Sequence, residues 1–236
     1  MNKNSLLIFI ASVAATGGLL FGFDTGVINV ALPAIREQFA LTPSQESNVV
    51  SAVLFGAMFG PFLSGFLTDI LGRKKINIIA SIVFVLGSIV AAIATSPGML
   101  IFGRLLLGLA IGIVAATVPL YLAELSPKEK RGQMVTYFQL AITLGILLSY
   151  LVGYIFEGAE NSWRLMFWAG FIPAILLLVG MFFIPESPRW LLSKGRESEA
   201  IEVLKKLRSS DDAQKELQET RDIIEEEKKN KGGWKE

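Results

Sequence analysis

Two ionisable side chains stand inside otherwise apolar segments and are the first candidates for chemistry. Asp24 and Arg104 each lie within a long run of hydrophobic residues. A charge at the centre of a bilayer costs at least about 2.5–3.5 kcal/mol on insertion scales, so such a group normally faces a partner or a hydrated cavity. The pair therefore predicts either a carboxylate that exchanges a proton while a guanidinium engages and releases it, or a structural ion pair. A third interpretation is that Asp24 extends to the outer headgroups.

A stripe of uncharged polar side chains lies in another apolar segment. Gln139 and Thr143 are four residues apart and share one face of a helix, and Tyr150 falls close to that face two turns on. Amide, hydroxyl and phenol groups offer hydrogen-bond donors and acceptors without charge, which suits a neutral polyhydroxyl ligand. Interhelical hydrogen bonding, which is common in membranes, is the alternative interpretation.

Three polar connectors repeat one arrangement of charge, in which an acidic residue precedes a turn and basic residues follow it. The acidic members are Asp69, Glu124 and Glu186, and the basic members include Arg73, Arg131 and Arg189. Ion pairs between such connectors would form a clasp that closes one side of a membrane protein. Each connector alone is also explained by the excess of positive charge on cytoplasmic loops.

The elements that carry these residues are predicted to be membrane-spanning helices. Hydrophobic residues make up 52 % of the 236 residues and charged residues 18 %, and residues 1–184 hold 18 charges while residues 185–236 hold 25. A span of a hydrocarbon core about 30 Å thick needs roughly 20 residues. Six segments qualify, namely Leu6–Val30, Ser47–Leu67, Ile76–Ala94, Met99–Leu122, Met134–Phe156 and Trp163–Ile184. We therefore expect an all-α, polytopic fold.

Composition excludes several classes of function. The chain contains no Cys and no His, which excludes a disulfide scaffold, a Cys/His metal site and a His-based catalytic triad. A net charge of +1 gives no reason to expect a nucleic-acid partner. No cofactor is expected, and no enzyme activity is expected either, because no single span carries a pair of carboxylates for acid–base work.

The distribution of Lys and Arg predicts the orientation in the cell membrane. With the N-terminus inside, seven basic residues outside the long tail fall on cytoplasmic segments and two fall on outer ones, so both termini are predicted to be cytoplasmic. Residues 1–184 then form a transmembrane domain and residues 185–236 a cytoplasmic helical tail. In that tail, the apolar stripe Ala200–Leu207 predicts a helix lying on the cytoplasmic face, and Asp222–Lys231 is a solvated charge run.

This orientation places the two intramembrane charges at similar depths. Asp24 lies 18 residues beyond Leu6, or about 27 Å above the inner edge, and Arg104 lies about 8 Å below the outer edge. Both fall in the outer third of the bilayer core, so an ion pair between them is geometrically possible.

The motifs resemble the sugar porter family of the major facilitator superfamily. Its loop signatures match at Gly65–Lys74, Glu124–Gly132 and Pro185–Leu191, and its helix motifs match at Phe21–Asp24, Gly103–Arg104 and Gln139–Leu140. The resemblance covers all of residues 1–236. It implies a transporter of two six-helix halves, each made of two inverted three-helix units, of which this chain is the N-terminal half.

The resemblance also implies roles for individual residues. Gln139 would hydrogen-bond a sugar, Phe21 would line the site against the sugar ring, and Asp24 would be the protonatable group with Arg104 as its partner. Thr143, on the face of Gln139, joins the candidate substrate residues. An inner charge network would close the cytoplasmic side and would consist of Asp69, Arg73, Glu124, Arg131, Glu186 and Arg189. Ile70 stands where the family often has a basic residue, which weakens one contact of that network.

The function expected from these features is transport of a monosaccharide by alternating access, with symport of a proton. The expected partners are the monosaccharide, the proton, the lipid bilayer and a C-terminal six-helix half. One alternative is facilitated sugar uniport, in which the Asp24–Arg104 pair is purely structural. The other is a non-transporting protein, either a sugar sensor or a remnant.

Overall fold

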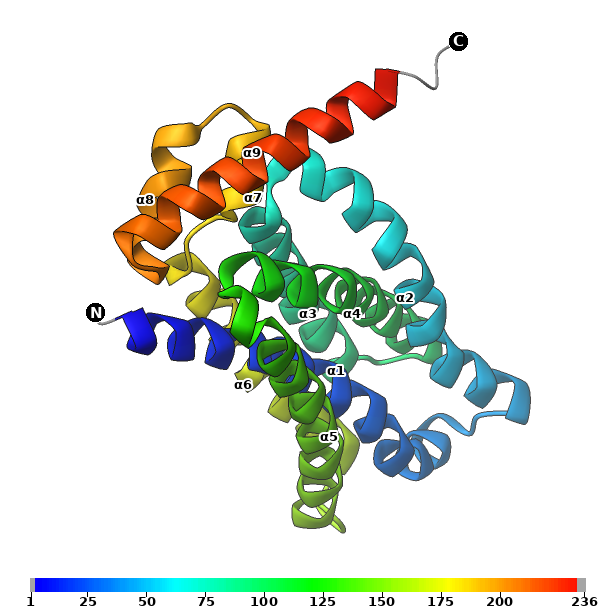
Figure 1. Ribbon diagram of the computed structural model, residues 1–236. Coiled ribbons are helices and arrows are strands. Elements are labelled where there is room, and N and C mark those ends of the chain that lie inside the picture. Colours follow the sequence, from blue (N-terminus) through cyan, green and yellow to red (C-terminus); the bar gives the residue numbers. More distant parts are fainter. Residues whose placement is uncertain (1–2, 233–236) are drawn as a thin grey trace.

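The computed structural model describes residues 3–232, with side chains as far as residue 224, and every regular element in that range is helical (Figure 1). The elements follow one another as α1 (Lys3–Phe39), α2 (Pro43–Leu71), α3 (Arg73–Ala92), α4 (Pro97–Leu125), the 3-10 turn η1 (Lys128–Lys130), α5 (Arg131–Ile155), α6 (Ser162–Phe183), α7 (Pro188–Ser193), α8 (Glu197–Leu207) and α9 (Ser210–Gly232). The helices α1 to α6 are long and apolar enough to cross a membrane, which confirms the six predicted spans.

The helices extend beyond the spans that hydropathy predicts. With 37 residues, α1 is about 55 Å long, well above the roughly 30 Å of a hydrocarbon core. Hydropathy detects only the apolar part of such a helix, so its polar ends were not included in the prediction. At the C-terminal ends of α3, α5 and α6 the difference has the opposite sign. These helices end at Ala92, Ile155 and Phe183, and the predicted spans continued to Ala94, Phe156 and Ile184.

Three helices begin with the same local device, a hydroxyl residue followed by proline. Thr42, Ser96 and Ser187 each accept a backbone N–H at the third helical position, and a proline occupies the first position of α2, α4 and α7. A hydroxyl N-cap satisfies an unpaired donor, and proline at the first position has no N–H to leave unpaired. These caps explain why each helix starts where it does.

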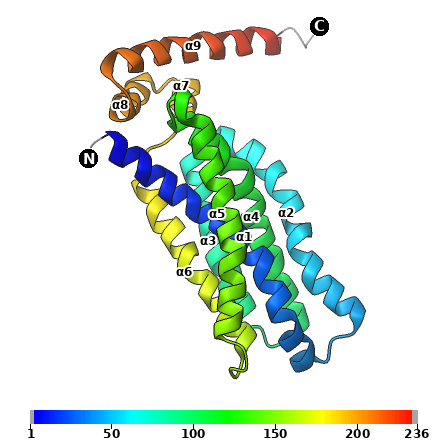
Figure 2. The ribbon, with the colours of Figure 1, turned by 60° about the horizontal axis from the view of Figure 1, so that its bottom comes forward.

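Close packing of backbones defines two pairs of helices, α1 with α5 and α2 with α4. A β-carbon at Gly22 would lie 1.8 Å from the Ile142 carbonyl oxygen, and one at Gly108 would lie 2.1 Å from the Val53 carbonyl oxygen. No side chain fits at either position, so only glycine allows these approaches. α1 and α5 run in the same direction, as the ribbon in Figure 2 shows.

The two pairs are related by an internal repeat. The spacing of Gly22, Gly26 and Pro33 in α1 recurs as Gly108, Gly112 and Pro119 in α4. The two helices run in opposite directions (Figure 2), so the chain consists of two inverted three-helix units, α1–α3 and α4–α6. In this repeat α1 corresponds to α4, and α2 corresponds to α5. The α1–α5 contact therefore corresponds to the α4–α2 contact, and both pairs pack closely for the same reason.

The short helices α7 and α8 and the long α9 lie across one end of the bundle (Figure 2). We call this the tail end, and the opposite end, which carries the connectors 40–42, 93–96 and 156–161, the far end. The indole N–H of Trp190 donates to the Asp69 carbonyl at 3.1 Å, and Arg208 donates to the Leu125 and Ser126 carbonyls at 3.3 and 2.9 Å. Both described ends of the chain lie at the tail end.

The predicted apolar stripe of the tail is the buried face of α8. Its members Ala200, Val203, Leu204 and Leu207 are buried, and Ile201 is half-buried. The predicted charge run Asp222–Lys231 falls on α9, and its side chains after residue 224 lie outside the described residues.

The helices α2 and α5 form the outer faces of the bundle. Only 33 % and 28 % of their most apolar windows are buried, against 61 % for α4. Their large exposed side chains are apolar, as in Phe55, Phe62 and Phe66 of α2 and Leu144, Leu147 and Leu151 of α5. Lipid or another apolar helix must cover these faces.

Candidate functional site: a buried ion pair and a charged tail end

The structure places the two intramembrane charges together in the interior of the bundle. Asp24 of α1 is 2 % exposed and Arg104 of α4 is 1 % exposed, and 3.8 Å separates Asp24 Oδ1 from Arg104 Nη1. The equal depths estimated from the sequence agree with this arrangement. Gly103 supports it, because a β-carbon there would lie 2.8 Å from the Ala91 backbone nitrogen of α3. α4 therefore approaches α3 closely enough to hold Arg104 inside.

The contact between the two charges is longer than a hydrogen bond. Charge-assisted N–H···O contacts usually measure about 2.7–2.9 Å. Asp24 Oδ2 and Arg104 Nη1 are both buried without a hydrogen-bond partner among the described residues. Buried polar groups are normally satisfied, so this pair is held together by charge and not by a fixed hydrogen bond.

Arg104 also has two uncharged contacts. Its Nε donates to the Val49 carbonyl of α2 at 2.9 Å, and its guanidinium carbon lies 5.9 Å from the ring centre of Phe167 in α6. Four helices therefore meet at this guanidinium. Neither Val49 nor Phe167 was singled out from the sequence, since a backbone carbonyl and a phenylalanine in an apolar helix carry no distinguishing signal.

The predicted substrate residues lie on the adjacent helices α1 and α5. Phe21 is half-buried, and Gln139 and Thr143 are exposed. The Thr143 hydroxyl donates to the Gln139 carbonyl at 3.4 Å, a long contact within the same helix. Because Gly22 meets Ile142 and Ile146, Phe21 and Thr143 lie at about the same height in the bundle.

Two polar residues of α1 extend this stripe and were missed from the sequence. Thr25 and Asn29 follow Phe21 at spacings of four residues, and both are exposed. The Thr25 hydroxyl donates to the Phe21 carbonyl at 2.8 Å, and the Asn29 amide donates to the Thr25 carbonyl at 3.4 Å. The same i, i+4 spacing that identified Gln139 and Thr143 would have found them. Tyr150, further along α5, is 49 % exposed.

At the tail end, Arg73 and Glu124 join α3 to α4. Arg73 Nε and Nη2 donate to the two carboxylate oxygens of Glu124 at 3.0 and 3.1 Å, a bidentate pair of largely buried side chains. Asp69 is peripheral to this pair: its side chain is 78 % exposed and lies 3.9 Å from Arg73.

Glu186 acts on the backbone of α3. Its Oε1 accepts the N–H groups of Arg73 and Lys74 at 2.9 and 3.1 Å. These N–H groups have no acceptor within the helix because they lie in the first turn of α3, and the N-cap residue Gly72 has no side chain to supply one. Gly72 adopts a φ of +93°, and a β-carbon there would lie 2.2 Å from Glu186 Oε2. The positive φ requires glycine at the turn between α2 and α3, and a β-carbon there would displace the Glu186 carboxylate from its position.

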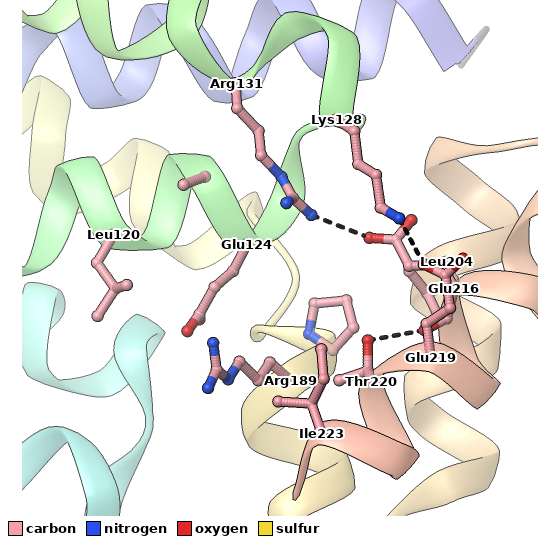
Figure 3. Close-up of a pocket in the computed structure, with 12 residues that line it drawn as sticks. Leu120, Glu124, Lys128, Arg131, Arg189, Leu204, Glu216, Glu219, Thr220 and Ile223 are labelled. Carbon is pink, nitrogen blue, oxygen red and sulfur yellow. Dashed lines mark hydrogen bonds and ion pairs between the residues drawn. The ribbon is translucent and has the colours of Figure 1, made fainter.

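The other predicted members of the charge network face the tail. Arg131 Nη2 donates to Glu216 at 3.4 Å and Lys128 donates to Glu219 at 2.5 Å, so the α4–α5 connector is bound to α9 (Figure 3). Arg189 lines the same cavity of about 220 Å³ as Glu124, and Figure 3 shows its guanidinium pointing toward that carboxylate. The network therefore contains two clusters, one at the start of α3 and one between α5 and α9.

Glu216, Glu219 and Arg208 complete the second cluster. Glu216 forms ion pairs with both Arg131 and Arg208. The hydrogen bond from Lys128 lowers the pKa of Glu219, whereas burial lowers the pKa of Arg208 against the opposing charge of Glu216. These three residues carry no distinguishing signal in the sequence, because they lie in a tail in which nearly half the residues are charged.

Buried polar contacts also join α3, α4 and the segment after α6. The Thr117 hydroxyl of α4 donates to Asn77 Oδ1 of α3 at 2.8 Å, and the Tyr121 hydroxyl donates to the Pro185 carbonyl. With the Arg73–Glu124 pair, these contacts join α3, α4 and the C-terminal end of α6 at the tail end.

Six membrane-length helices in two inverted units, with a buried ion pair between the units, define a membrane transport domain of the major facilitator type. The chain belongs to the family described as "Sugar (and other) transporter", whose model matches residues 10–236.

Relatives of known description agree with this membership. The chain is 46 % identical over 228 residues to the arabinose-proton symporter of Escherichia coli (strain K12). The matched region covers 96 % of this chain and 48 % of that protein. It is 44 % identical over 223 residues to the glucose transporter GlcP of Staphylococcus epidermidis, and the matched region covers 94 % of this chain and 49 % of that protein. The chain thus spans about half the length of the curated relatives it matches.

Solved structures agree with the fold. The MFS proton:xylose symporter XylE bound to 6-bromo-6-deoxy-D-glucose superposes with a TM-score of 0.91 at 29 % identity, over 98 % of this chain and 55 % of that one. The inward open conformation of XylE from E. coli gives a TM-score of 0.85 at 29 % identity, over 93 % and 56 %.

Proposed function

We propose that this chain supplies the N-terminal six-helix half of a transporter that moves a monosaccharide by alternating access, coupled to a proton. The observation that carries the proposal is the buried contact between Asp24 and Arg104, which is too long for a hydrogen bond. Two kinds of relative support it: the arabinose- and galactose-proton symporters in sequence and the proton:xylose symporter in fold.

The proton would be carried by Asp24. While Asp24 is ionised, its charge attracts Arg104 and holds α1 to α4. When Asp24 takes up a proton the attraction ends, and Arg104 keeps only the Val49 carbonyl and the Phe167 ring. Because the two states differ in the attraction between α1 and α4, protonation can shift the balance between two arrangements of these helices.

The sugar would bind beside α1 and α5. Phe21, Gln139 and Thr143 lie on these adjacent helices, and the exposed groups offer hydrogen-bond donors and acceptors without charge. A second six-helix half would complete the site and would cover the apolar faces of α2 and α5. Its presence is suggested by the length of the relatives, of which this chain spans about half.

The charged tail end would close the cytoplasmic side. We propose that both ends of the chain are cytoplasmic, in the cell membrane, with residues 1–184 as the membrane domain and the residues from 185 onward as a linker. The gate would consist of Asp69, Arg73, Glu124, Arg131, Glu186 and Arg189. Its strongest contacts are the Arg73–Glu124 pair and the cap that Glu186 places on α3.

The test is Asp24→Asn in the assembled transporter, which contains this chain and the companion half, in proteoliposomes with an imposed pH gradient. Asparagine cannot exchange a proton. We expect proton-driven accumulation of labelled sugar to fall to the equilibrium level, while exchange of sugar across the membrane without a gradient stays measurable. Uptake of a panel of labelled pentoses and hexoses would identify the substrate.

The matched control is Glu37→Gln, which removes an exposed carboxylate from the same helix. This variant should accumulate sugar as the wild type does. Accumulation that persists in Asp24→Asn would contradict proton coupling through this residue. If the wild type equilibrates sugar without alkalinising the medium, the protein is a uniporter and the Asp24–Arg104 pair is structural.

A further inference from the structure

The position of the Arg104 guanidinium is set mainly by groups other than its ionic partner. Its Nε donates to the Val49 carbonyl at 2.9 Å, its Cζ lies over the Phe167 ring at 5.9 Å from the ring centre, and Asp24 Oδ1 is 3.8 Å from Nη1. The carbonyl holds one edge of the guanidinium, and the ring limits its rotation. Since Nη1 makes no hydrogen bond, a small rotation would suffice to bring it onto the carboxylate.

We propose that Phe167 is a positioning residue that holds Arg104 away from a direct hydrogen bond with Asp24. The inference rests on the proposed function, because it concerns the carboxylate to which proton transfer is assigned there. A cation over an aromatic face is stabilised by the ring without any competing hydrogen bond. Phe167 therefore retains the guanidinium near the carboxylate and leaves Asp24 Oδ2 unoccupied for a proton.

The ring of Phe167 is itself fixed by contacts that reach the far end of the bundle. Trp163, one turn earlier on α6, meets it edge to face with ring centres 6.2 Å apart and an angle of 86°. The Trp163 indole N–H donates to Gln38 Oε1 of α1 at 2.7 Å, and Arg164 stacks on the indole at 4.1 Å. Phe167 is 3 % exposed and Trp163 is 1 % exposed, so both rings are packed against other groups on nearly all sides.

The far-end contacts tie this aromatic pair to three helices. Arg164 donates to Gln38 Oε1 at 2.9 Å and to the Ala94 carbonyl after α3 at 2.6 Å. The end of α1, the end of α3 and the start of α6 are thereby joined at the position from which Trp163 supports Phe167. The orientation of the Phe167 ring thus depends on contacts about a helix turn from the ion pair.

No other charge competes for this position. Each of Asp24 and Arg104 is the one charged group acting on the other among the described residues. At this level α5 presents Ile146 and Ser149 to α1, α6 presents Phe167 and Gly170, and α2 presents the Val49 carbonyl. Removal of the ring would therefore leave Asp24 as the strongest attraction for the freed Nη1.

The experiment is Phe167→Met in the assembled transporter, with proton-driven uptake measured from pH 5 to 9. Methionine fills a similar volume but has no aromatic face. Without the ring, Arg104 closes onto Asp24 and stabilises the carboxylate, so the midpoint of the pH profile should move to the acid side by about one pH unit. Phe167→Tyr keeps the ring face and should retain the wild-type profile.

Phe171→Leu is the matched control, because this phenylalanine lies one turn further along α6 and contacts Trp168 and not Arg104. Trp163→Phe, which loses the bond to Gln38, should give a smaller acid shift. An unchanged profile in Phe167→Met, or a shift to the alkaline side, would overturn the inference. Failure of both Phe167→Met and Phe167→Leu to assemble would also overturn it, since Phe167 would then be a packing residue.

The design separates this inference from the proposed function. Asp24→Asn is measured in the same assay. If Asp24→Asn loses coupling while the Phe167 variants follow the wild type, the positioning role is wrong and the symport function stands. If Asp24→Asn remains coupled, the proposed function itself fails.

Discussion

The two buried ion pairs between membrane helices, Arg73–Glu124 and Asp24–Arg104, differ in geometry, and the difference matches their proposed tasks. Arg73 and Glu124 form two hydrogen bonds of 3.0 and 3.1 Å between α3 and α4. Arg104 and Asp24 are 3.8 Å apart and share none. A bidentate pair fixes the relative position of two helices. A pair held by charge alone can separate when one partner is neutralised, as a proton-coupled step requires.

At the residue scale, Gly72 offers the sharpest test of the tail-end cluster. We expect Gly72→Ala to lower the free energy of unfolding by about 2 kcal/mol or more, because alanine is strained at positive φ and its β-carbon displaces the Glu186 cap of α3. Thermal unfolding in detergent measures the loss. Gly98→Ala, at a helical position with open space around it, should leave the melting temperature almost unchanged. Equal melting of both variants would contradict the capping role of Glu186.

The sequence singled out candidate residues, but it could not predict the contacts between them. Asp24 and Arg104 are found because charges are rare in apolar spans, and their depths follow from the rise of a helix. The length of the contact and the role of Phe167 depend on side-chain rotamers, which spacing does not determine. The acidic connector residues were identified, but Glu186 binds backbone N–H groups and not a neighbouring cation.

At the element scale, the closest approaches of glycines to a neighbouring helix backbone in the described residues are between α1 and α5 and between α2 and α4. They consist of glycines against backbone atoms, and in the described residues α5 has no side-chain hydrogen bond to another membrane helix. By contrast, α3 and α4 are joined by the Thr117–Asn77 and Arg73–Glu124 contacts. Polar side-chain contacts therefore hold α3 and α4 together. α5 is held against its neighbour α1 by close packing of the backbones.

The shape of the α1–α5 contact can be tested at Gly145. A β-carbon there would lie 2.2 Å from the Leu19 carbonyl oxygen and 2.8 Å from the Phe23 nitrogen. We expect Gly145→Ala to separate the two helices and to destabilise the fold by about 1–3 kcal/mol, the usual cost of overpacking. Unfolding in a denaturing detergent series gives the measurement. Gly132→Ala, at the start of α5 with nothing within 4 Å, is the control, and a similar loss there would argue against a specific helix contact.

The number of spans was predictable and their neighbours were not. An apolar run of about 20 residues is long enough to cross a bilayer as a helix, so six such runs predict six membrane-spanning helices. Glycine pairs such as Gly22–Gly26 and Gly108–Gly112 indicate close packing, but the spacing does not say which helix approaches. The match of Gly22, Gly26 and Pro33 with Gly108, Gly112 and Pro119 is visible in the sequence, and it would have predicted the relation between the two pairs.

At the scale of the whole molecule, the tail helices are fastened to the membrane bundle through Arg208. Its guanidinium donates to the Leu125 and Ser126 carbonyls at the end of α4 and pairs with Glu216 of α9. Lys128 and Arg131 join the same helix to the start of α5. Any movement of α5 relative to α4 therefore acts on α9 as well.

This attachment predicts the effect of Arg208→Ala. Two buried carbonyls would lose their donors and Glu216 would lose its closest partner, so α9 should open more often. We expect backbone amide exchange in α9 to accelerate about tenfold or more, with exchange in α4 little changed, as hydrogen–deuterium exchange can measure. Lys206→Ala, which removes an exposed pair with Glu202 on α8, is the control. Unaltered exchange in α9 would show that its docking does not depend on Arg208.

The separation of the buried charges along the chain has a consequence for biosynthesis. Arg104 follows Asp24 by 80 positions, so at about 5–20 residues per second the ribosome adds Asp24 some 4–16 seconds before it adds the partner cation. During that interval the newly inserted first helix holds an uncompensated acid in the lipid. Stable integration of the first helix should therefore await the arrival of the fourth, and nascent chains halted before residue 104 should leave the first helix extractable from the membrane.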